Sequence, residues 1–193
     1  SEAMLNPVPS GVSADQAALT EPLAVGRHAV AKAGLQGSEE ILVVGCGPVG
    51  LAVIASLKAL GHGPVYASDF SSARRALAEQ LGADEVVDPE LHDPLRARSW
   101  PKDGQTVIFD CVGVCLETDH ARPLIAVNKE LNVQYVLGYS TEEFTETLSW
   151  IADGRFDVSE WVTQTVGLDG VVDAFAKLAA PDAHGKILVD PGV

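Results

Sequence analysis

The 193-residue sequence is short of basic residues, cysteines and long apolar runs. Only 13 Lys and Arg stand against 27 Asp and Glu, a formal net charge of −14, which argues against partners such as nucleic acid or an anionic membrane. No apolar run approaches the roughly 20 residues of a membrane span, and the polar opening segment is not expected to be an export signal. Three cysteines do not make a disulfide framework, so we expect reduced thiols and a cytoplasmic location.

The composition that remains, 47% hydrophobic and 21% charged, is that of an ordinary globular chain. The continuous run at 41–44 is typical of a strand buried on both faces of a parallel sheet. Helical and strand patterns then alternate over 48–88, and a further strand is expected at 106–112. We therefore predict an α/β fold with a doubly wound parallel sheet over 35–193, preceded by an interdomain segment and lead-in helix over 1–34.

The second half carries weaker patterns. A strand is expected at 131–137, and Ser140 with Glu143 forms a capping-box pattern that begins a helix. A later amphipathic pattern predicts a helix capped by Asp169, with Val171, Val172, Phe175 and Leu178 facing the core.

A glycine-rich turn follows the buried strand. Gly45 permits the tight turn, Gly47 leaves room for a pyrophosphate, and Gly50 allows close helix–strand packing. Asp69 ends the next strand, where its carboxylate would accept both ribose hydroxyls and repel a 2′-phosphate. The pattern therefore predicts NAD binding in preference to NADP. The expected contacts in this turn are Gly45, Gly47, Pro48, Val49 and Gly50.

Arg74 lies one helical turn beyond Asp69. It either contacts the adenosine end of the cofactor or is a solvated surface arginine. The sequence has no P-loop motif and no Tyr followed by Lys four positions later, which argues against a nucleotide-phosphate hydrolase of the P-loop type and against a short-chain dehydrogenase.

Several segments together resemble the medium-chain, zinc-type alcohol dehydrogenases, most closely the polyol and threonine dehydrogenase branch. The resemblance implies hydride transfer between a small alcohol or polyol and NAD, with zinc polarising the substrate oxygen. It also implies a homodimer or tetramer formed through the strand at 131–137. The segments that carry the resemblance are ALTEPLAVG at 18–26, VVGCGPVGL at 43–51, LGAD at 81–84, FDCVG at 109–113, NKEL at 128–131 and GKILV at 185–189.

The resemblance also implies roles for individual residues. Glu21 matches a glutamate close to the catalytic zinc, although a glutamate at a helix start is also explained by the helix dipole. Val25 either lines the nicotinamide pocket or packs in the core, and His28 is either a proton carrier or a packed helix histidine. The residues expected on the nicotinamide side are Val112, Gly113, Val114, Cys115 and Leu137.

The sequence departs from the family pattern in two places. The family's N-terminal GroES-like domain, which supplies a Cys and a His-Glu pair as zinc ligands, has no counterpart here, so this chain alone is expected neither to hold zinc nor to be active. A helix-strand unit of roughly 20–25 residues is also expected between Gly113 and Val114, because parallel strands need a crossover of a dozen or more residues. The alternative at that point is a true deletion.

Two other functions stay open at this stage. One is a non-catalytic NAD-binding module or redox sensor. The other is a zinc-independent oxidoreductase related to quinone reductases, against which Asp69 and Glu21 both weigh.

Overall fold

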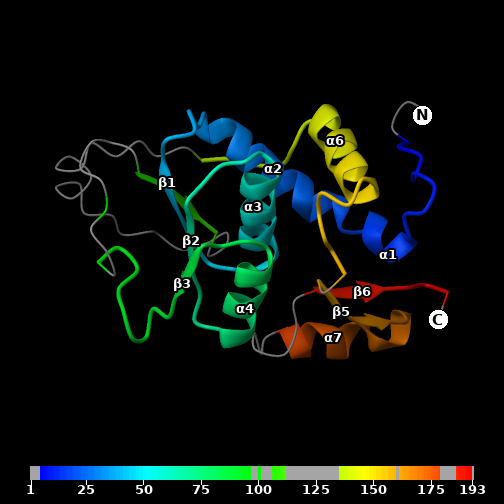
Figure 1. Cartoon of the computed structure of the whole chain (residues 1–193). Coiled ribbons are helices and arrows are strands. Elements are labelled where there is room, and N and C mark those ends of the chain that lie inside the picture. Colours follow the sequence, from blue (N-terminus) through cyan, green and yellow to red (C-terminus); the bar gives the residue numbers. More distant parts are fainter. Residues whose placement is uncertain are drawn as a thin grey trace.

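The computed structural model describes residues 5–96, 100, 106–111, 135–159, 161–178 and 186–192. Its centre is a parallel sheet in the order β3-β2-β1-β4, with helices packed against it (Figure 1). The strands are β1 (Glu40–Val44), β2 (Val65–Ser68), β3 (Glu85–Val87) and β4 (Thr106–Asp110). Strands and helices alternate along this part of the chain, which confirms the predicted α/β class.

Several helices begin at a serine whose side chain caps the first turn. Ser71 accepts a hydrogen bond from the Arg74 N–H at 3.3 Å, and Ser140 and Glu143 form the predicted capping box. None of the described helices is long and apolar enough to cross a membrane. The described α-helices are α1 (Ala14–Ala17), α2 (Thr20–Ala33), α3 (Pro48–Ala59), α4 (Ser72–Gln80), α6 (Thr141–Ala152) and α7 (Val171–Leu178).

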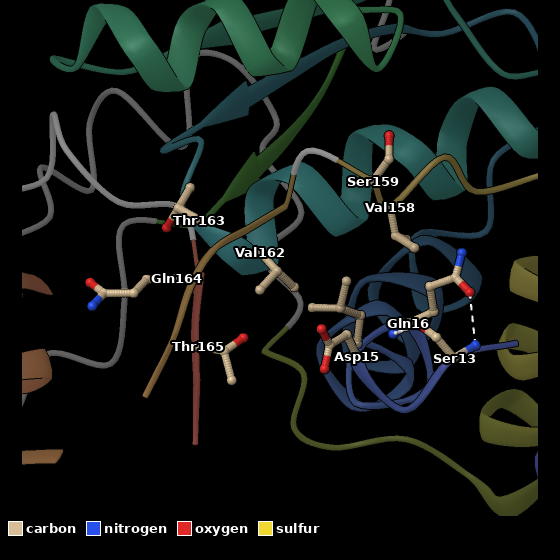
Figure 2. A pocket seen from close by; sticks show the side chains of 10 residues that line it. Ser13, Asp15, Gln16, Val158, Ser159, Val162, Thr163, Gln164 and Thr165 are labelled. Carbon is tan, nitrogen blue, oxygen red and sulfur yellow. Dashed lines mark hydrogen bonds between the residues drawn. The ribbon is translucent and has the colours of Figure 1, made fainter. Parts of the chain in front are cut away.

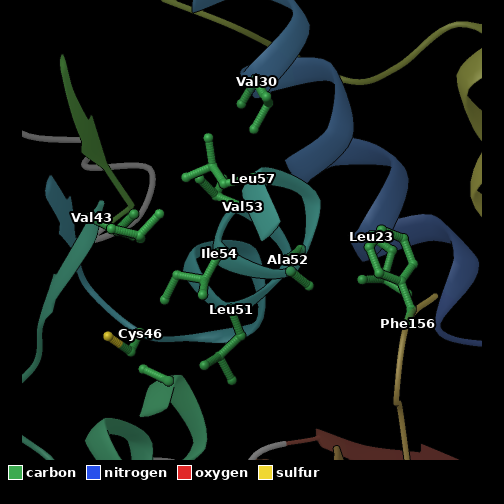
Figure 3. Close-up of a cluster of buried hydrophobic side chains, with 14 of the residues drawn as sticks. Leu23, Val30, Val43, Cys46, Leu51, Ala52, Val53, Ile54, Leu57 and Phe156 are labelled. Carbon is green, nitrogen blue, oxygen red and sulfur yellow. The ribbon is translucent and has the colours of Figure 1, made fainter. Parts of the chain in front are cut away.

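The hydrophobic core lies where β1, α2 and α3 meet (Figure 3). The side chains of Ile41, Leu42 and Val43 in β1 are fully buried, as the continuous apolar run predicted. Every residue of α3 from Gly50 to Leu57 is also buried, so α3 is the central helix of the fold. Leu23 of α2 belongs to the same cluster. The predicted division of the chain at 34/35 stays a prediction.

Contacts on two sides, with α3 and with α6, fix the position of α2. A Cβ on Gly26 would stand 2.5 Å from the main-chain carbon of Ala52, so glycine is required where α2 crosses α3. On the side of α6, Arg27 pairs with Glu146 at 3.0 Å and His28 Nδ1 lies 2.8 Å from the Glu143 carboxylate. The polar face of α2 is therefore bound to α6 while its apolar face enters the core.

Strands β5 (Val162–Val166) and β6 (Lys186–Val189) pair in parallel as a separate two-stranded sheet, with α7 between them in sequence (Figure 1). The prediction that α7 turns Val172 and Phe175 toward the core is wrong, since these side chains are 79% and 73% exposed. Helical periodicity identifies an apolar face, but it does not say whether another element covers that face.

The strand predicted at 131–137 is not confirmed. Residues 131–134 lie outside the described residues, and residues 135–137 have no strand assignment. A strand exists only where a neighbouring strand accepts its hydrogen bonds, and β4 is the last strand of the sheet in the part of the chain described. Among residues 135–137, which are described, the predicted strand is therefore absent.

Candidate functional site

Strand register brings three strand ends together at one edge of the sheet. Val44 of β1 is paired with Ser68 of β2 on one side and with Asp110 of β4 on the other. The residues that follow these three strands, Gly45, Asp69 and Cys111, are therefore neighbours, although they lie far apart in sequence. The carboxyl edge of a parallel sheet is where open α/β folds bind ligands.

The glycine turn joins β1 to α3 at this edge. Gly45 has φ +89°, a conformation that favours glycine, and its N–H donates to the Ser68 carbonyl at 2.7 Å. Gly47 caps α3, and Pro48 occupies the first turn. The first turn of a helix carries main-chain N–H groups without intrahelical acceptors, together with the positive end of the helix dipole. The turn is thus built to receive an anion.

The glycines of the turn have different physical tasks. A Cβ on Gly50 would stand 1.8 Å from the Gly45 carbonyl oxygen, so glycine is needed for packing. A Cβ on Gly47 would meet nothing within 4 Å, and its φ of −69° is open to any residue. Packing among the described residues therefore does not explain Gly47. Free space above the backbone is what an approaching phosphate group requires.

Asp69 is tied to the glycine turn through its carboxylate. One oxygen accepts the Cys46 N–H at 2.7 Å and the other accepts the Ser71 N–H at 2.8 Å. The side chain is 10% exposed. A carboxylate oxygen can accept more than one hydrogen bond, so both oxygens of Asp69 can still accept bonds from ligand hydroxyl groups.

Two arginines of α4 lie near Asp69. Arg74, predicted from sequence, places a guanidinium nitrogen 4.0 Å from the Asp69 carboxylate, and its buried Nε has no hydrogen-bond partner within the described ranges. Arg75, which the sequence interpretation missed, donates to the Asp69 and Phe70 carbonyls and pairs with Asp88. The sequence signal for the contacts of Arg75 was its place directly after Arg74, within one or two helical turns of Asp69.

The two cysteines at this edge are neutral thiols. Burial and the nearby Asp69 carboxylate raise the pKa of Cys46 to about 12. Burial and the neighbouring Asp110 likewise raise the pKa of Cys111 to about 12. Neither thiol is suited to act as a nucleophile or a metal-binding thiolate at neutral pH.

The remaining sequence candidates are not brought to the glycine turn in the part of the chain described. Glu21 is exposed in the first turn of α2, and Leu137 is 92% exposed in an irregular segment. His28 contacts Glu143, and Val25 is half-buried. The candidates that lie outside the described residues are Val112, Gly113, Val114 and Cys115. Within the described ranges, no group of three or more His, Cys, Asp or Glu side chains could hold a metal ion.

A separate hollow of about 500 Å³ opens between α1 and β5 (Figure 2). Its lining contains none of the predicted site residues. Most of its side chains end in hydroxyl or amide groups, among them Ser13, Gln16, Thr163 and Thr165.

Comparison with known proteins places these features in a family. Residues 48–121 match the sequence profile of the zinc-binding dehydrogenases. The (R,R)-butanediol dehydrogenase of Bacillus subtilis strain 168 is 33% identical over 98% of this chain and 62% of its own length. A solved structure of a 2R,3R-butanediol dehydrogenase from Bacillus subtilis superposes with a TM-score of 0.82 at 32% identity, over 98% of this chain and 61% of that one.

Two other solved structures share the fold and hold different cofactors. An alcohol dehydrogenase of Escherichia coli CFT073 in complex with NADH has a TM-score of 0.80 at 19% identity. A protein of Sinorhizobium meliloti 1021 described as a zinc-binding dehydrogenase, bound to NADP, has a TM-score of 0.81 at 23% identity. Each comparison covers 95% of this chain and 61% of the other. The fold alone therefore does not decide which dinucleotide binds.

The relatives are longer than this chain in two respects. The chain spans about 62% of the length of the butanediol dehydrogenase. The alignment with that protein also runs over 215 residues, whereas 98% of 193 residues is about 189, a difference of about 26 residues. This difference agrees in size with the unit predicted between Gly113 and Val114. That position lies outside the described residues.

Proposed function

The chain belongs to the zinc-type medium-chain alcohol dehydrogenase family, whose nucleotide-binding part it matches, and on that basis we propose that it binds NAD(H) as the cofactor-binding half of an alcohol or polyol dehydrogenase. The observation that carries the proposal is the hydrogen bond from Cys46 N–H to the Asp69 carboxylate. It joins a glycine turn with room for phosphates to a carboxylate suited to a ribose.

The described residues fit a dinucleotide. The first turn of α3 and the open backbone at Gly47 would hold the pyrophosphate. Asp69 would accept the adenosine ribose hydroxyls, and Arg74 would lie beside them with its Nε, which has no hydrogen-bond partner among the described residues. The remaining proposed contacts are Gly45, Pro48, Val49, Gly50, Val112, Gly113, Val114, Cys115 and Leu137. When bound, NAD supplies the hydride chemistry at its nicotinamide ring.

Asp69 also carries our proposal that NAD is preferred over NADP. A 2′-phosphate on the adenosine ribose would bring two negative charges against a carboxylate that is only 10% exposed. Arg75 does not offset this repulsion, because its guanidinium is paired with Asp88 at 2.8 Å. Arg74, 4.0 Å from the Asp69 carboxylate, is the one cation of this pair that would attract a 2′-phosphate, so the proposed preference depends on the Asp69 charge outweighing it. The fold itself does not select the cofactor. The negative charge of the Asp69 carboxylate, at the end of β2, is what favours NAD here.

The proposal also covers the catalytic zinc and the substrate of the whole protein. We propose that the whole protein oxidises or reduces a small alcohol or polyol, with Glu21 close to the zinc. Glu21 is one exposed carboxylate, and a catalytic zinc site takes about three protein ligands, so the described residues do not fit a zinc site by themselves. Assembly as a dimer or tetramer through residues 131–137 and a cytoplasmic location are proposed on the family resemblance.

The experiment that tests cofactor binding is a calorimetric titration of this chain with NADH, NADPH and ADP-ribose. We expect binding of NADH and ADP-ribose, and weaker binding of NADPH. Asp69→Asn should weaken NADH binding. Its matched control is Asp93→Asn, which removes an exposed carboxylate remote in sequence from the turn and should leave NADH binding unchanged. A chain that binds none of the three ligands would contradict the proposal. Binding without alcohol oxidation by the full-length protein would favour a non-catalytic module.

A further inference from the structure

Arg75 connects three separate pieces of chain. One guanidinium nitrogen donates to the main-chain carbonyls of Asp69 at 2.7 Å and Phe70 at 2.8 Å. The other terminal nitrogen lies 2.8 Å from the carboxylate of Asp88, the residue after β3. The side chain is only 16% exposed. Arg75 therefore spans from α4 to the ends of β2 and β3.

The segment that Arg75 holds carries the ribose carboxylate. Asp69 and Phe70 are the linkers between β2 and the Ser71 cap of α4. The Phe70 side chain is 69% exposed, so it does not anchor this segment in the core. In the same segment the Ser71 N–H donates to the Asp69 carboxylate at 2.8 Å. The main-chain contacts of Arg75 thus hold the segment from which the Asp69 side chain extends.

The ion pair with Asp88 fixes the orientation of the Arg75 guanidinium group. A guanidinium presents its donors in a rigid planar arrangement, so a carboxylate on one nitrogen orients the other nitrogen as well. The Asp88 side chain is 24% exposed, and its charge balances that of Arg75. Arg74, by contrast, approaches Asp69 only at 4.0 Å and through the side chain.

We propose that Arg75, directed by Asp88, is a positioning residue that holds the Asp69 carboxylate in place for the cofactor ribose. This rests on the proposed function, because it assigns the ribose to Asp69. Arg75 acts through main-chain carbonyls and does not itself contact the ligand. Its contribution to binding therefore depends on the presence of the Asp69 carboxylate.

A double-mutant cycle in NADH affinity tests the proposal. Arg75→Gln should weaken NADH binding about tenfold in the wild-type chain, the scale of a hydrogen bond to a charged group. It should have little further effect in an Asp69→Ala background, and Arg75→Lys should restore part of the loss. Arg96→Gln, which removes an exposed ion-paired arginine, should leave affinity unchanged. Equal losses in both backgrounds, or no loss at all, would overturn the positioning role.

A second measurement keeps this inference separate from cofactor binding itself. The Ser71 and Cys46 amides both donate to the Asp69 carboxylate, so their hydrogen-exchange rates report its position without a ligand. Exchange at both amides should accelerate in Arg75→Gln and not in Arg96→Gln. If the wild-type chain binds no NADH but this acceleration appears, the proposed function fails and the ribose role fails with it, whereas the hold of Arg75 on the Asp69 carboxylate is confirmed. Unchanged exchange would overturn the positioning role.

Discussion

Gly50 packs directly against the main-chain carbonyl of Gly45, so closely that a Cβ on Gly50 would stand 1.8 Å from that oxygen. The contact closes the turn between β1 and α3 and fixes where the helix begins. A Cβ on Gly47, three residues earlier, would have no described atom within 4 Å. The same short motif therefore contains one glycine required by packing and one that packing leaves unexplained, which gives a matched pair of variants.

Gly50→Ala is expected to destabilise the fold. The added methyl group meets backbone, which cannot rotate away as a side chain does, so the cost should be about 3 kcal/mol, at the upper end for overpacked sites. Urea unfolding followed by circular dichroism measures it. An unfolding free energy equal to that of the wild type would show that α3 can shift without cost.

Gly47→Ala should have the opposite profile. The backbone at this position suits any residue and the space is open, so stability should be unchanged or higher by about 0.5 kcal/mol. NADH affinity should fall about tenfold, because the methyl group occupies the approach of the pyrophosphate. Calorimetric titration of this variant checks the second statement. Wild-type affinity would remove Gly47 from the proposed phosphate site.

Asp69→Asn should change cofactor preference. The amide keeps one acceptor oxygen but loses the negative charge, so NADH binding should weaken while NADPH binding improves. We expect the ratio of the two dissociation constants to shift at least about tenfold. Asp93→Asn, which removes an exposed carboxylate, should leave the ratio as it is. A constant ratio in Asp69→Asn would mean that another group selects the cofactor.

The contact between His28 and Glu143 predicts a pH-dependent stability. Partial burial raises the pKa of Glu143, but the hydrogen bonds from Ser140 N–H and His28 and the nearby positive charges outweigh it, and the net pKa lies below the usual 4.5. A lowered folded-state pKa contributes stability above the unfolded value and loses it as pH falls through the folded value.

Glu143→Gln keeps an acceptor oxygen for the Ser140 N–H but removes the charge, so it should cost about 0.5–1 kcal/mol at pH 7, the scale of a charged group at a helix N-terminus. The difference in unfolding free energy from the wild type should shrink as pH falls below about 4.5. Urea unfolding of both chains at pH 7, 5 and 4 measures it. A difference that is constant or grows toward acid would contradict the ionised contact.

The buried thiols predict low reactivity. With pKa values of about 12, Cys46 and Cys111 are almost entirely protonated at pH 8. Iodoacetamide should modify them slowly in the folded chain and rapidly in urea, as followed by peptide mass mapping. Fast modification of either thiol in the folded chain would show that it is ionised or open to solvent.

Local sequence was sufficient for much of the fold. The β-branched run of β1, the glycine turn and the serine caps of α4 and α6 each depend on residues within one or two turns of chain, and each is found where it was predicted. Asp69 was also predicted at the end of β2, because the spacing from Gly50 reflects one crossover helix and one strand. Periodicity and capping are short-range properties, so sequence alone determined them.

Only the tertiary structure decided which distant groups meet. The bond between Cys46 N–H and Asp69 spans 23 residues, and the pair of Arg75 with Asp88 depends on the register of β2 and β3. The sequence leaves His28 open to a catalytic or a structural role, and only helix packing places Glu143 beside it. Strand register and helix packing are set by the whole core, whereas a side chain's own neighbours in sequence carry no record of its partner across the fold.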